Sequence, residues 1–348
     1  MAYTTLNKSS SFMNPKLYTG DGGTQSVTGV GFQPDWTWIK NRGSTDSHNV
    51  YDSVRGVTKY LLTNNSVAEG TTSGVTAFNS DGFSVGNNSM TNSNSNNYAS
   101  WNWKAGTAVS GNTSGSGTYK TYTGSVNTTS GFSIIKYTGN GTAGHTIPHH
   151  LGVAPSMIIT KIISGDTSSW YMYHKSLGNT GNIFLDTTAA VSNSGAWWNS
   201  TTPTSSVFTV GDQTGNNSNN NTFISYNFAE VPGFSQFGSY TGNGNADGPF
   251  IFTGFKPAFV LIKNSSQNNG WWQMTDNARS PFNVVEKAIF SNVNDAEYDS
   301  ANYATDFVSN GFKLRNSTAG SNVNNDVYIY MAFGQTLVGT NNVPANAG

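Results

Sequence analysis

The chain has 348 residues and a formal net charge of −1, and only 10% of its residues are charged, against about 25% in ordinary globular proteins. So weak a field offers no attraction for nucleic acid or for an acidic membrane surface, so neither is an expected partner. No apolar run approaches the ~20 residues that span a bilayer. Because the chain has no cysteine, disulfides and cysteine metal sites are excluded.

Neutral polar residues must therefore make the surface polar, and Asn, Ser, Thr and Gly supply them in runs such as residues 87–97. These residue types favour turns and disfavour helices. The 20 Phe, 16 Tyr and 9 Trp argue against disorder, because they lie in β-type runs between the polar tracts. The composition thus predicts an all-β protein with almost no helix.

Each expected unit opens with the tripeptide Tyr-Thr-Gly, at Tyr18, Tyr137 and Tyr240. In the second and third copies an Asn-Gly pair follows, which signals a hairpin turn because both residues tolerate positive φ. Each unit is therefore expected to begin with a strand, a tight turn and a return strand.

A short apolar strand follows in each unit, at residues 34–40, 155–162 and 257–263. Each copy opens with a proline, which can start a strand but cannot sit inside its hydrogen-bonded ladder, so the pattern predicts a buried strand with a fixed start. Lys40, Lys161 and Lys263 near the strand ends are 121 and 102 residues apart. That period is the size of a β-sandwich and too long for a solenoid repeat.

The end of each unit is its most strand-like part. Residues 98–103, 223–228 and 328–333 carry aromatic side chains with a period of two. This alternation predicts a half-buried strand with one aromatic set facing the core. The Asn-rich stretches before these strands are expected to be polar loops.

These repeats give the expected domain boundaries. The almost absent spacer at 231–233 predicts that the last two units dock rigidly, and residues 119–123 inside the linker fit an edge strand. The expected organisation is an N-terminal arm at 1–15, a β-sandwich unit at 16–106, a Gly/Ser/Thr linker at 107–130, a second unit at 131–231, a third at 234–335 and a C-terminal tail at 336–348.

Several of these patterns, in one order and with one spacing, resemble the repeat domain of virion structural proteins of tailed phages, many of them marine. The resemblance covers about 16–335 and implies three tandem antiparallel β-sandwich domains of the jelly-roll or lectin-like kind. It leaves the position on the particle open. The matching stretches are 240–249, 254–264, 271–274, 276–279 and 309–314 in the third unit, with 139–149, 170–178 and 205–211 in the second.

The resemblance implies a phage structural protein. The expected function is that of a non-enzymatic protein on the particle surface, in a tail or fibre-type appendage, that acts by assembly contacts and by adhesion to a host-surface glycan. A capsid decoration protein without a glycan ligand is the first alternative. The expected partners are other virion proteins and further copies of the chain, for which a trimer is one arrangement; no cofactor is expected. Because residues 1–15 are polar and show no secretory signal, synthesis in the host cytoplasm and release by lysis are expected.

A glycan depolymerase is the second alternative. Cleavage of a glycosidic bond needs two carboxylates about 5 to 9.5 Å apart. The four glutamates, Glu69, Glu230, Glu286 and Glu297, share no position between units, and Asp276 matches Asp52 but is replaced by His174 in the second unit. The sequence therefore assigns no catalytic residue.

The sequence assigns no metal site either. The histidines lack helical i, i+4 spacing and a cysteine partner, so they are expected to be solvated loop residues. Oxygen-bearing side chains in 211–216 offer some calcium ligands, with an ordinary solvated turn as the alternative. The five histidines are His48, His145, His149, His150 and His174.

Two adjacent tryptophan pairs give the sharpest binding hypothesis. In a strand, neighbouring side chains point to opposite faces, so one tryptophan of each pair could be exposed beside a loop. An exposed indole can stack on a sugar ring while neighbouring amides bond its hydroxyls, with packing in the core or in a subunit contact as the alternative. The candidate carbohydrate-binding residues are Trp197, Trp198, Trp271, Trp272, Asn268 and Asn269.

Overall fold

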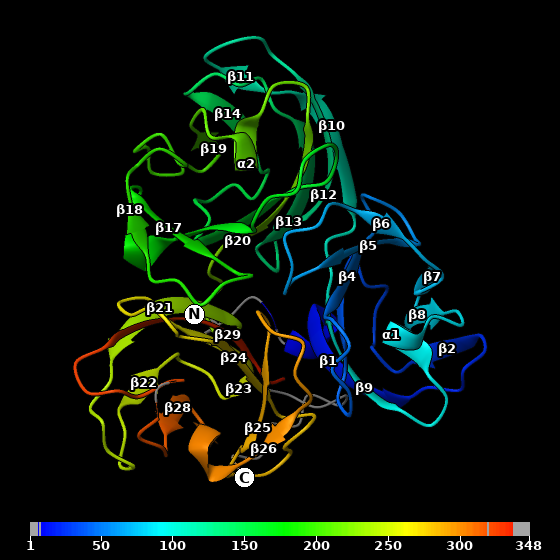
Figure 1. Ribbon diagram of the computed structural model, residues 1–348, viewed down its shortest axis with the longest axis vertical. Helices are drawn as coiled ribbons and strands as arrows, with labels where there is room; N and C mark the ends of the chain where they lie inside the picture. Colours follow the sequence, from blue (N-terminus) through cyan, green and yellow to red (C-terminus); the bar gives the residue numbers. More distant parts are fainter. Residues whose placement is uncertain (1–5, 7, 319, 337–348) are drawn as a thin grey trace.

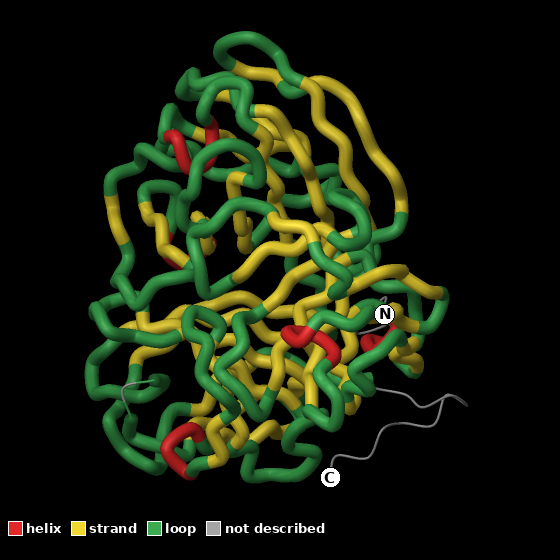
Figure 2. Tube along the Cα trace, turned by 45° about the vertical axis from the view of Figure 1, so that its right-hand side comes forward, coloured by secondary structure: helices red, strands yellow, loops and turns green. Residues whose placement is uncertain are grey.

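A computed structural model describes residue 6, residues 8–318 and residues 320–336, and it is all-β, as the composition predicted. Six antiparallel sheets pair into three sandwich-like units, each with one large and one small sheet. The units form a triangle around a common centre (Figure 1). Figure 2 shows how little helix accompanies the strands. No helix in the described ranges is long and apolar enough to cross a membrane.

Unit 1 contains a six-stranded and a three-stranded sheet. Its large sheet has the order β1 (Met13–Thr19), β9 (Asn97–Trp103), β3 (Trp36–Asn41), β4 (Asn49–Asp52), β5 (Lys59–Leu62) and β6 (Gly70–Thr71). Its small sheet has the order β2 (Gln25–Thr28), β8 (Gly82–Val85) and β7 (Val75–Asn79).

Unit 2 has the same plan with two added strands in its large sheet. That sheet runs β10 (Thr107–Asn112), β12 (Thr121–Asn127), β13 (Phe132–Thr138), β20 (Thr222–Phe228), β15 (Met157–Ile162), β16 (Tyr171–His174), β17 (Gly181–Phe184) and β18 (Ser192–Asn193). The small sheet runs β11 (Ser114–Gly115), β14 (His145–Pro148) and β19 (Val207–Val210).

Unit 3 returns to the plan of unit 1. Its large sheet runs β21 (Ser235–Thr241), β29 (Val327–Gly334), β23 (Pro257–Asn264), β24 (Trp272–Asp276), β25 (Lys287–Phe290) and β26 (Tyr298–Asp299). Its small sheet runs β22 (Phe250–Phe252), β28 (Gly311–Leu314) and β27 (Thr305–Val308).

The stretch 107–130 is not a spacer between units. It contains β10, β11 and β12, and β12 lies inside the large sheet of unit 2, paired with both β10 and β13. Beyond the strands, the described ranges hold only short helical turns. These are 3-10 turns at Ser9–Ser11, Lys175–Leu177 and Ala301–Tyr303, and the four-residue helices α1 (Ser89–Asn92) and α2 (Thr214–Asn217).

The Asn-rich stretches, which were expected to be solvated loops, each contain a buried asparagine whose side chain bonds to neighbouring turns. Asn92, Asn217 and Asn322 are fully buried at matching positions of the three units. Each accepts a backbone N–H from the turn after Tyr-Thr-Gly and donates to nearby carbonyls, as Asn217 does to Thr142 O at 2.9 Å. A buried amide keeps such a position only when its hydrogen bonds are satisfied, which explains why these asparagines recur.

The opening tyrosines complete the same repeated device. Tyr18, Tyr137 and Tyr240 each donate their hydroxyl to a carbonyl in the Asn-rich stretch at 2.7 Å. Each ring also stacks on the first aromatic residue of the last strand, Tyr98, Phe223 or Tyr328, with centroids 5.0 to 5.2 Å apart. The three sandwiches are therefore copies of one design.

Both faces of the central strands of each large sheet are buried, which corrects the expectation of half-buried last strands. One face packs against the small sheet of its own unit, and the other faces a central hydrophobic cluster shared by all three units. In β9, for example, Tyr98 belongs to the sandwich core, whereas Trp101 and Trp103 belong to the central cluster. A single sandwich has only one inner face, so the second buried face comes from the triangle.

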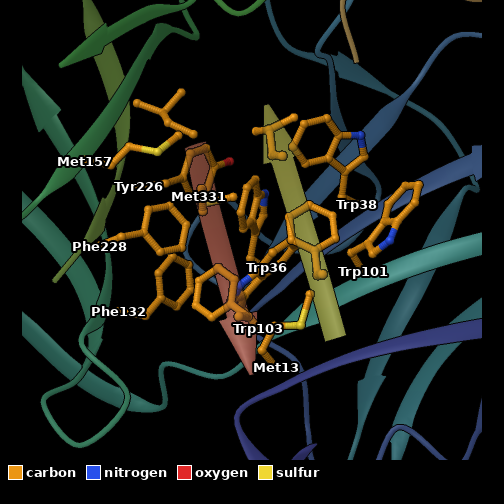
Figure 3. Close-up of a cluster of buried hydrophobic side chains, with 14 of the residues drawn as sticks. Met13, Trp36, Trp38, Trp101, Trp103, Phe132, Met157, Tyr226, Phe228 and Met331 are labelled. Carbon is orange, nitrogen blue, oxygen red and sulfur yellow. The ribbon is translucent and has the colours of Figure 1, made fainter. Parts of the chain in front are cut away.

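At the middle of this central cluster, matching residues of the three last strands meet. The rings of Trp103, Phe228 and Phe333 lie pairwise 6.4, 6.1 and 5.9 Å apart, all edge to face. Trp36 of unit 1 stacks on Tyr226 of unit 2 at 4.6 Å. Figure 3 shows side chains from several strands converging there, among them Trp103, Phe228 and Met331. The molecule thus has an approximate threefold axis within one chain.

Hydrogen bonds close the triangle at all three seams. Trp170 of unit 2 donates its indole N–H to Leu62 O of unit 1 at 2.8 Å, and Trp272 of unit 3 donates to Phe184 O of unit 2 at 2.9 Å. Between units 3 and 1, the Thr63 hydroxyl donates to Ser291 O at 2.9 Å. The chain therefore returns from the third unit to the first, which the expected tandem order did not predict.

Candidate functional site

The two tryptophan pairs lie in different environments, and one member of each is buried. Trp198 belongs to the sandwich core of unit 2, edge to face with Tyr173. Trp272 lies in the central cluster and bonds across the seam to Phe184. Neither side chain is accessible to a ligand, so these two candidates are core residues.

Trp197 and Trp271 are each half-buried, as the alternation argument predicted for one residue of a pair. The ring of Trp197 leans on Tyr171 and Phe184, at centroid distances of 6.3 and 6.2 Å, away from any cleft described below. The ring of Trp271 leans on Phe290 at 4.7 Å, and its other side borders an open cleft in unit 3.

This cleft, called the Trp271 cleft below, has a volume of about 240 Å³. A row of aromatic contacts runs from Trp271 through Phe290 to Tyr303, and the ring centroids of Phe290 and Tyr303 are 5.1 Å apart. The residues that line it are Asn269, Trp271, Asn302, Tyr303, Thr318 and Gly320. It therefore combines a broad aromatic surface with amide and hydroxyl groups.

Local backbone geometry places these groups. Trp271 precedes β24, and Asn269 before it has a φ of +70°, a left-handed conformation that asparagine adopts more readily than most residues. The Ser300 side chain caps the 3-10 turn that carries Asn302 and Tyr303. The Thr318 hydroxyl donates to Asn302 O at 2.7 Å, which joins the loop that carries Thr318 to this turn.

Several polar groups at the cleft have no partner within the described part of the chain. The Trp271 indole N–H, the Tyr303 hydroxyl and the Asn302 amide side chain make no hydrogen bond there. Buried Gln273 lies beside the cleft, and its Oε1 also has no hydrogen-bond partner. This oxygen is 3.1 Å from the place that a Cβ on Gly320 would occupy. An unpaired buried acceptor is costly, and Gly320 is a cleft residue close to this oxygen.

The cleft has no acid–base machinery. Its six lining residues include no carboxylate, lysine or arginine. Burial raises the pKa of the Tyr303 phenol, so this side chain stays a neutral donor and acceptor over the physiological range. The arrangement can hold a neutral polar molecule with an apolar face.

The expected asparagines have separate roles. Asn269 lines the cleft, whereas Asn268 uses its Oδ1 to accept the backbone N–H of Ala190 in unit 2 at 3.0 Å. Asn268 therefore belongs to the seam between units 2 and 3. Of the six sequence candidates, Trp271 and Asn269 share the cleft.

Asp52 and Asp276, the acidic residues that match between units 1 and 3, are each paired with an arginine. The Asp276 carboxylate binds the Arg279 guanidinium at 2.5 Å and also accepts the Trp101 indole N–H. Asp52 pairs with Arg55 in the same way and accepts the Tyr226 hydroxyl at 2.7 Å. The carboxylates of both pairs are fully buried, and they stabilise the seams between units.

The expectation of solvated histidines is wrong for four of the five. His48, His145, His149 and His174 are buried, and only His150 is exposed. His145, for example, contacts Asn217 Oδ1 at 3.0 Å and the Thr113 hydroxyl at 2.6 Å. Local sequence could not show that the loops carrying them fold inward. The described residues contain no cluster of three or more His, Asp or Glu able to hold a metal.

Sequence reasoning missed Tyr303, Asn302, Thr318, Gly320 and Gln273. One signal was present in the repeats: the strand register aligns Trp272 with Trp170, so this tryptophan recurs between units. Trp271 then aligns with Ser169, which marks it as an unrepeated aromatic residue. A tryptophan that one copy carries and another lacks is not required by the shared fold.

Comparison with known proteins gives one family match. Residues 8–336 match a domain of unknown function, DUF7483. No curated protein and no solved structure matches the chain.

Proposed function

We propose that this chain, which belongs to the DUF7483 family of domains of unknown function over nearly its whole length, is a non-enzymatic binding protein that holds a carbohydrate in the Trp271 cleft. The observation that carries the proposal is the half-buried Trp271 ring, which lines the cleft together with side-chain polar groups of Tyr303 and Asn302 that have no hydrogen-bond partner among the described residues.

The chemistry of the cleft fits a sugar better than other small ligands. A pyranose ring has an apolar face that packs on an indole, and hydroxyls around its rim that act as donors and acceptors. The cleft offers the matching set: the Trp271 indole N–H, the side-chain amides of Asn269 and Asn302, and the Tyr303 phenol. A nucleotide would also stack on Trp271, but no lysine or arginine lines the cleft to balance its phosphates.

The disposition of carboxylates supports binding without cleavage. A glycoside hydrolase places two carboxyl groups on either side of the scissile bond. Here Asp52 and Asp276 are buried in arginine pairs, and no carboxylate lines the cleft. The depolymerase alternative therefore has no support in this geometry.

The proposed setting is the surface of a tailed-phage particle, on a tail or fibre-type appendage. The sequence resemblance to virion repeat domains supports it, and so does the low charge of a surface made polar by neutral groups. Weak contacts from several copies of the protein would add through effective concentration, which suits adhesion to a host-surface glycan. Immunogold labelling of particles assembled with this chain tests the setting, and label confined to unassembled protein would contradict it.

Glycan-array binding of the full chain tests the cleft. Wild-type protein should bind a restricted set of glycans, and Trp271→Ala should weaken binding by at least ~10-fold, which corresponds to about 1.4 kcal/mol. Trp197→Ala is the matched control, since this tryptophan is also half-buried but lies outside the cleft. Absence of binding, or binding unchanged in Trp271→Ala, would reject carbohydrate recognition. Cleavage of the glycans during incubation with the protein would instead support the depolymerase alternative.

A further inference from the structure

The outer strand of the small sheet in unit 3, β22, carries two exposed phenylalanines. Phe250 and Phe252 are 47% and 64% exposed, whereas Ile251 between them is buried in the sandwich core. Both rings point to the outer face of the sheet, and the Phe250 ring lies over Gly311 of β28. The exposed aromatic residues therefore sit at the free edge of a sheet.

The other two units show that the fold does not require them. Each small sheet pairs one apolar residue of its edge-side strand with a core phenylalanine of the next strand. These pairs are Val27 with Phe83 in unit 1, Ile147 with Phe208 in unit 2 and Ile251 with Phe312 in unit 3, so Val27, Ile147 and Ile251 occupy equivalent positions. The residues flanking these three are Ser26 and Thr28 in unit 1, Thr146 and Pro148 in unit 2, and Phe250 and Phe252 in unit 3. The same sheet thus forms without aromatic side chains on this face.

The edge of β22 is also open for backbone pairing. Thr253 N donates to Asn310 O, and Leu314 N donates to Pro249 O. Because hydrogen-bonded pairs alternate along an antiparallel ladder, Ile251 faces β28 and the peptide groups of Phe250 and Phe252 face outward. Neither residue makes a further backbone hydrogen bond within the described ranges.

Unit 2 shows what covers this edge when it is covered. There β11, supplied by the 107–130 stretch, pairs antiparallel with β14, with Ser114 opposite Thr146. Thr146 is the counterpart of Phe250. Unit 1 leaves its edge open but lines it with exposed Ser26 and Thr28, a polar finish that discourages association. Within the part of the chain that the structure describes, no strand covers this edge in unit 3, and its exposed side chains are aromatic rather than polar.

We propose that the β22 edge is an interface for a second copy of this chain, formed by antiparallel pairing of β22 with its twofold-related mate. A register centred on Ile251 places Phe250 opposite Phe252 of the second copy, and vice versa. The outward peptide groups of these residues then pair, and four phenylalanines gather on one face of a continuous six-stranded sheet. The edge is self-complementary, so one surface supplies both sides.

Charges around the edge do not oppose this pairing. Lys313, which faces Phe250 across the ladder, pairs with Asp247 at 2.8 Å, and Asp306 pairs with Arg315 at 3.4 Å. Each of these charges is therefore already paired with an opposite charge in its own chain, so the two copies do not repel each other at this edge. The strand is only three residues long, so the dimer should be weak and concentration-dependent.

Analytical ultracentrifugation of the full chain over a concentration series tests the proposal. Wild-type protein should form reversible dimers, and the double variant Phe250→Ser with Phe252→Thr should remain monomeric. These substitutions install the residues that unit 1 carries at the same positions, so the sheet should still fold. Phe282→Ser, at another exposed phenylalanine (82% exposed), should dimerise like wild type.

Hydrogen exchange gives a second readout on the unaltered protein. The amides of Phe250 and Phe252 should exchange freely in dilute solution and become protected at high concentration. Wild-type protein that stays monomeric throughout, an association that survives the double variant, or protection that appears elsewhere would each overturn the proposal. If the edge instead pairs with a different protein, the purified chain should stay monomeric in both experiments. None of these outcomes depends on glycan binding by the Trp271 cleft.

Discussion

Trp101 of unit 1 donates its indole N–H to the buried carboxylate of Asp276 in unit 3, at 3.0 Å. The same position in unit 2, Tyr226, donates its hydroxyl to Asp52 of unit 1. In unit 3 the position is Met331, which cannot donate, and His174 of unit 2 instead donates its Nε2–H to the neighbouring carbonyl of Tyr330 at 3.2 Å. Each seam therefore has a hydrogen bond at an equivalent place, but the donor and acceptor groups differ between the seams.

Replacement of Trp101 by Phe should destabilise the protein by about 2 to 4 kcal/mol. The change removes the indole donor and part of a buried ring, and leaves the Asp276 carboxylate with one partner fewer. Urea unfolding measures the loss. Met331→Leu at the matching position removes no hydrogen bond and should cost less than about 1.5 kcal/mol. Equal losses at the two sites would show that the Trp101 bond contributes nothing.

Truncation of Phe333 to Ala should cost about 3 to 5 kcal/mol, because this ring meets Trp103 and Phe228 at the centre of the triangle. Phe282→Ala is the control, since this side chain is 82% exposed and its loss should change the free energy of unfolding by less than about 0.5 kcal/mol. Thermal and urea unfolding should agree on the order. A small effect at Phe333 would mean that the three units unfold independently.

Stability should fall as the pH drops from about 6.5 towards 4. Burial lowers the pKa of His174 to about 4 and that of His149 to about 4. The unfolded chain takes up these protons near pH 6.5, so between the two values protonation favours unfolding, by up to about 3 kcal/mol for each histidine.

Urea unfolding at pH 7 and at pH 4.5 measures this slope. His174→Gln should flatten it, because the glutamine does not titrate, whereas His150→Gln should change it less, since His150 is exposed. An identical slope in wild-type protein and His174→Gln would contradict the assignment.

On the alkaline side, stability should rise with pH from about 7 to about 10. Lys40, Lys161 and Lys263 are buried, and desolvation lowers their pKa values to about 8, 8 and 7. The unfolded chain keeps these protons until about pH 10.5, so the cost of burying charged ammonium groups is relieved as the folded protein loses them.

Lys263 has the largest shift, and Lys263→Met should remove the largest share of the alkaline rise. Unfolding free energies at pH 7, 8 and 9 give the readout, and they stop short of the ionisation of unfolded tyrosines near pH 10. A flat wild-type profile over this range would show that the three ammonium groups are not desolvated as the fold implies.

The repeats in the sequence were sufficient to predict the sandwich architecture but not the closed triangle. Period-two aromatic residues such as Trp101 and Trp103 indicate a buried face. They cannot say whether the opposite face, here Tyr98, is buried too, because that depends on residues more than a hundred positions away. Likewise, Asn92 and His145 look polar locally, and only the tertiary fold shows that their hydrogen bonds are satisfied inside it.

For the candidate site, sequence reasoning found one wall. Trp271 and Asn269 were accessible to a pattern argument because the pair and the amides are adjacent in the chain. Tyr303 and Thr318 join them through folding of distant segments, and Trp198 and Trp272 were included because an adjacent pair does not reveal which member is buried.

The threefold arrangement within a single chain has a consequence for specialisation. An assembly of three identical subunits displays every surface feature three times, and a mutation alters all of them together. Here each unit has its own stretch of sequence. Unit 3 can therefore carry the Trp271 cleft and the exposed Phe252 edge while units 1 and 2 keep the shared scaffold without them. Separate coding of the three units therefore permits a nearly symmetric scaffold to make different contacts on each side.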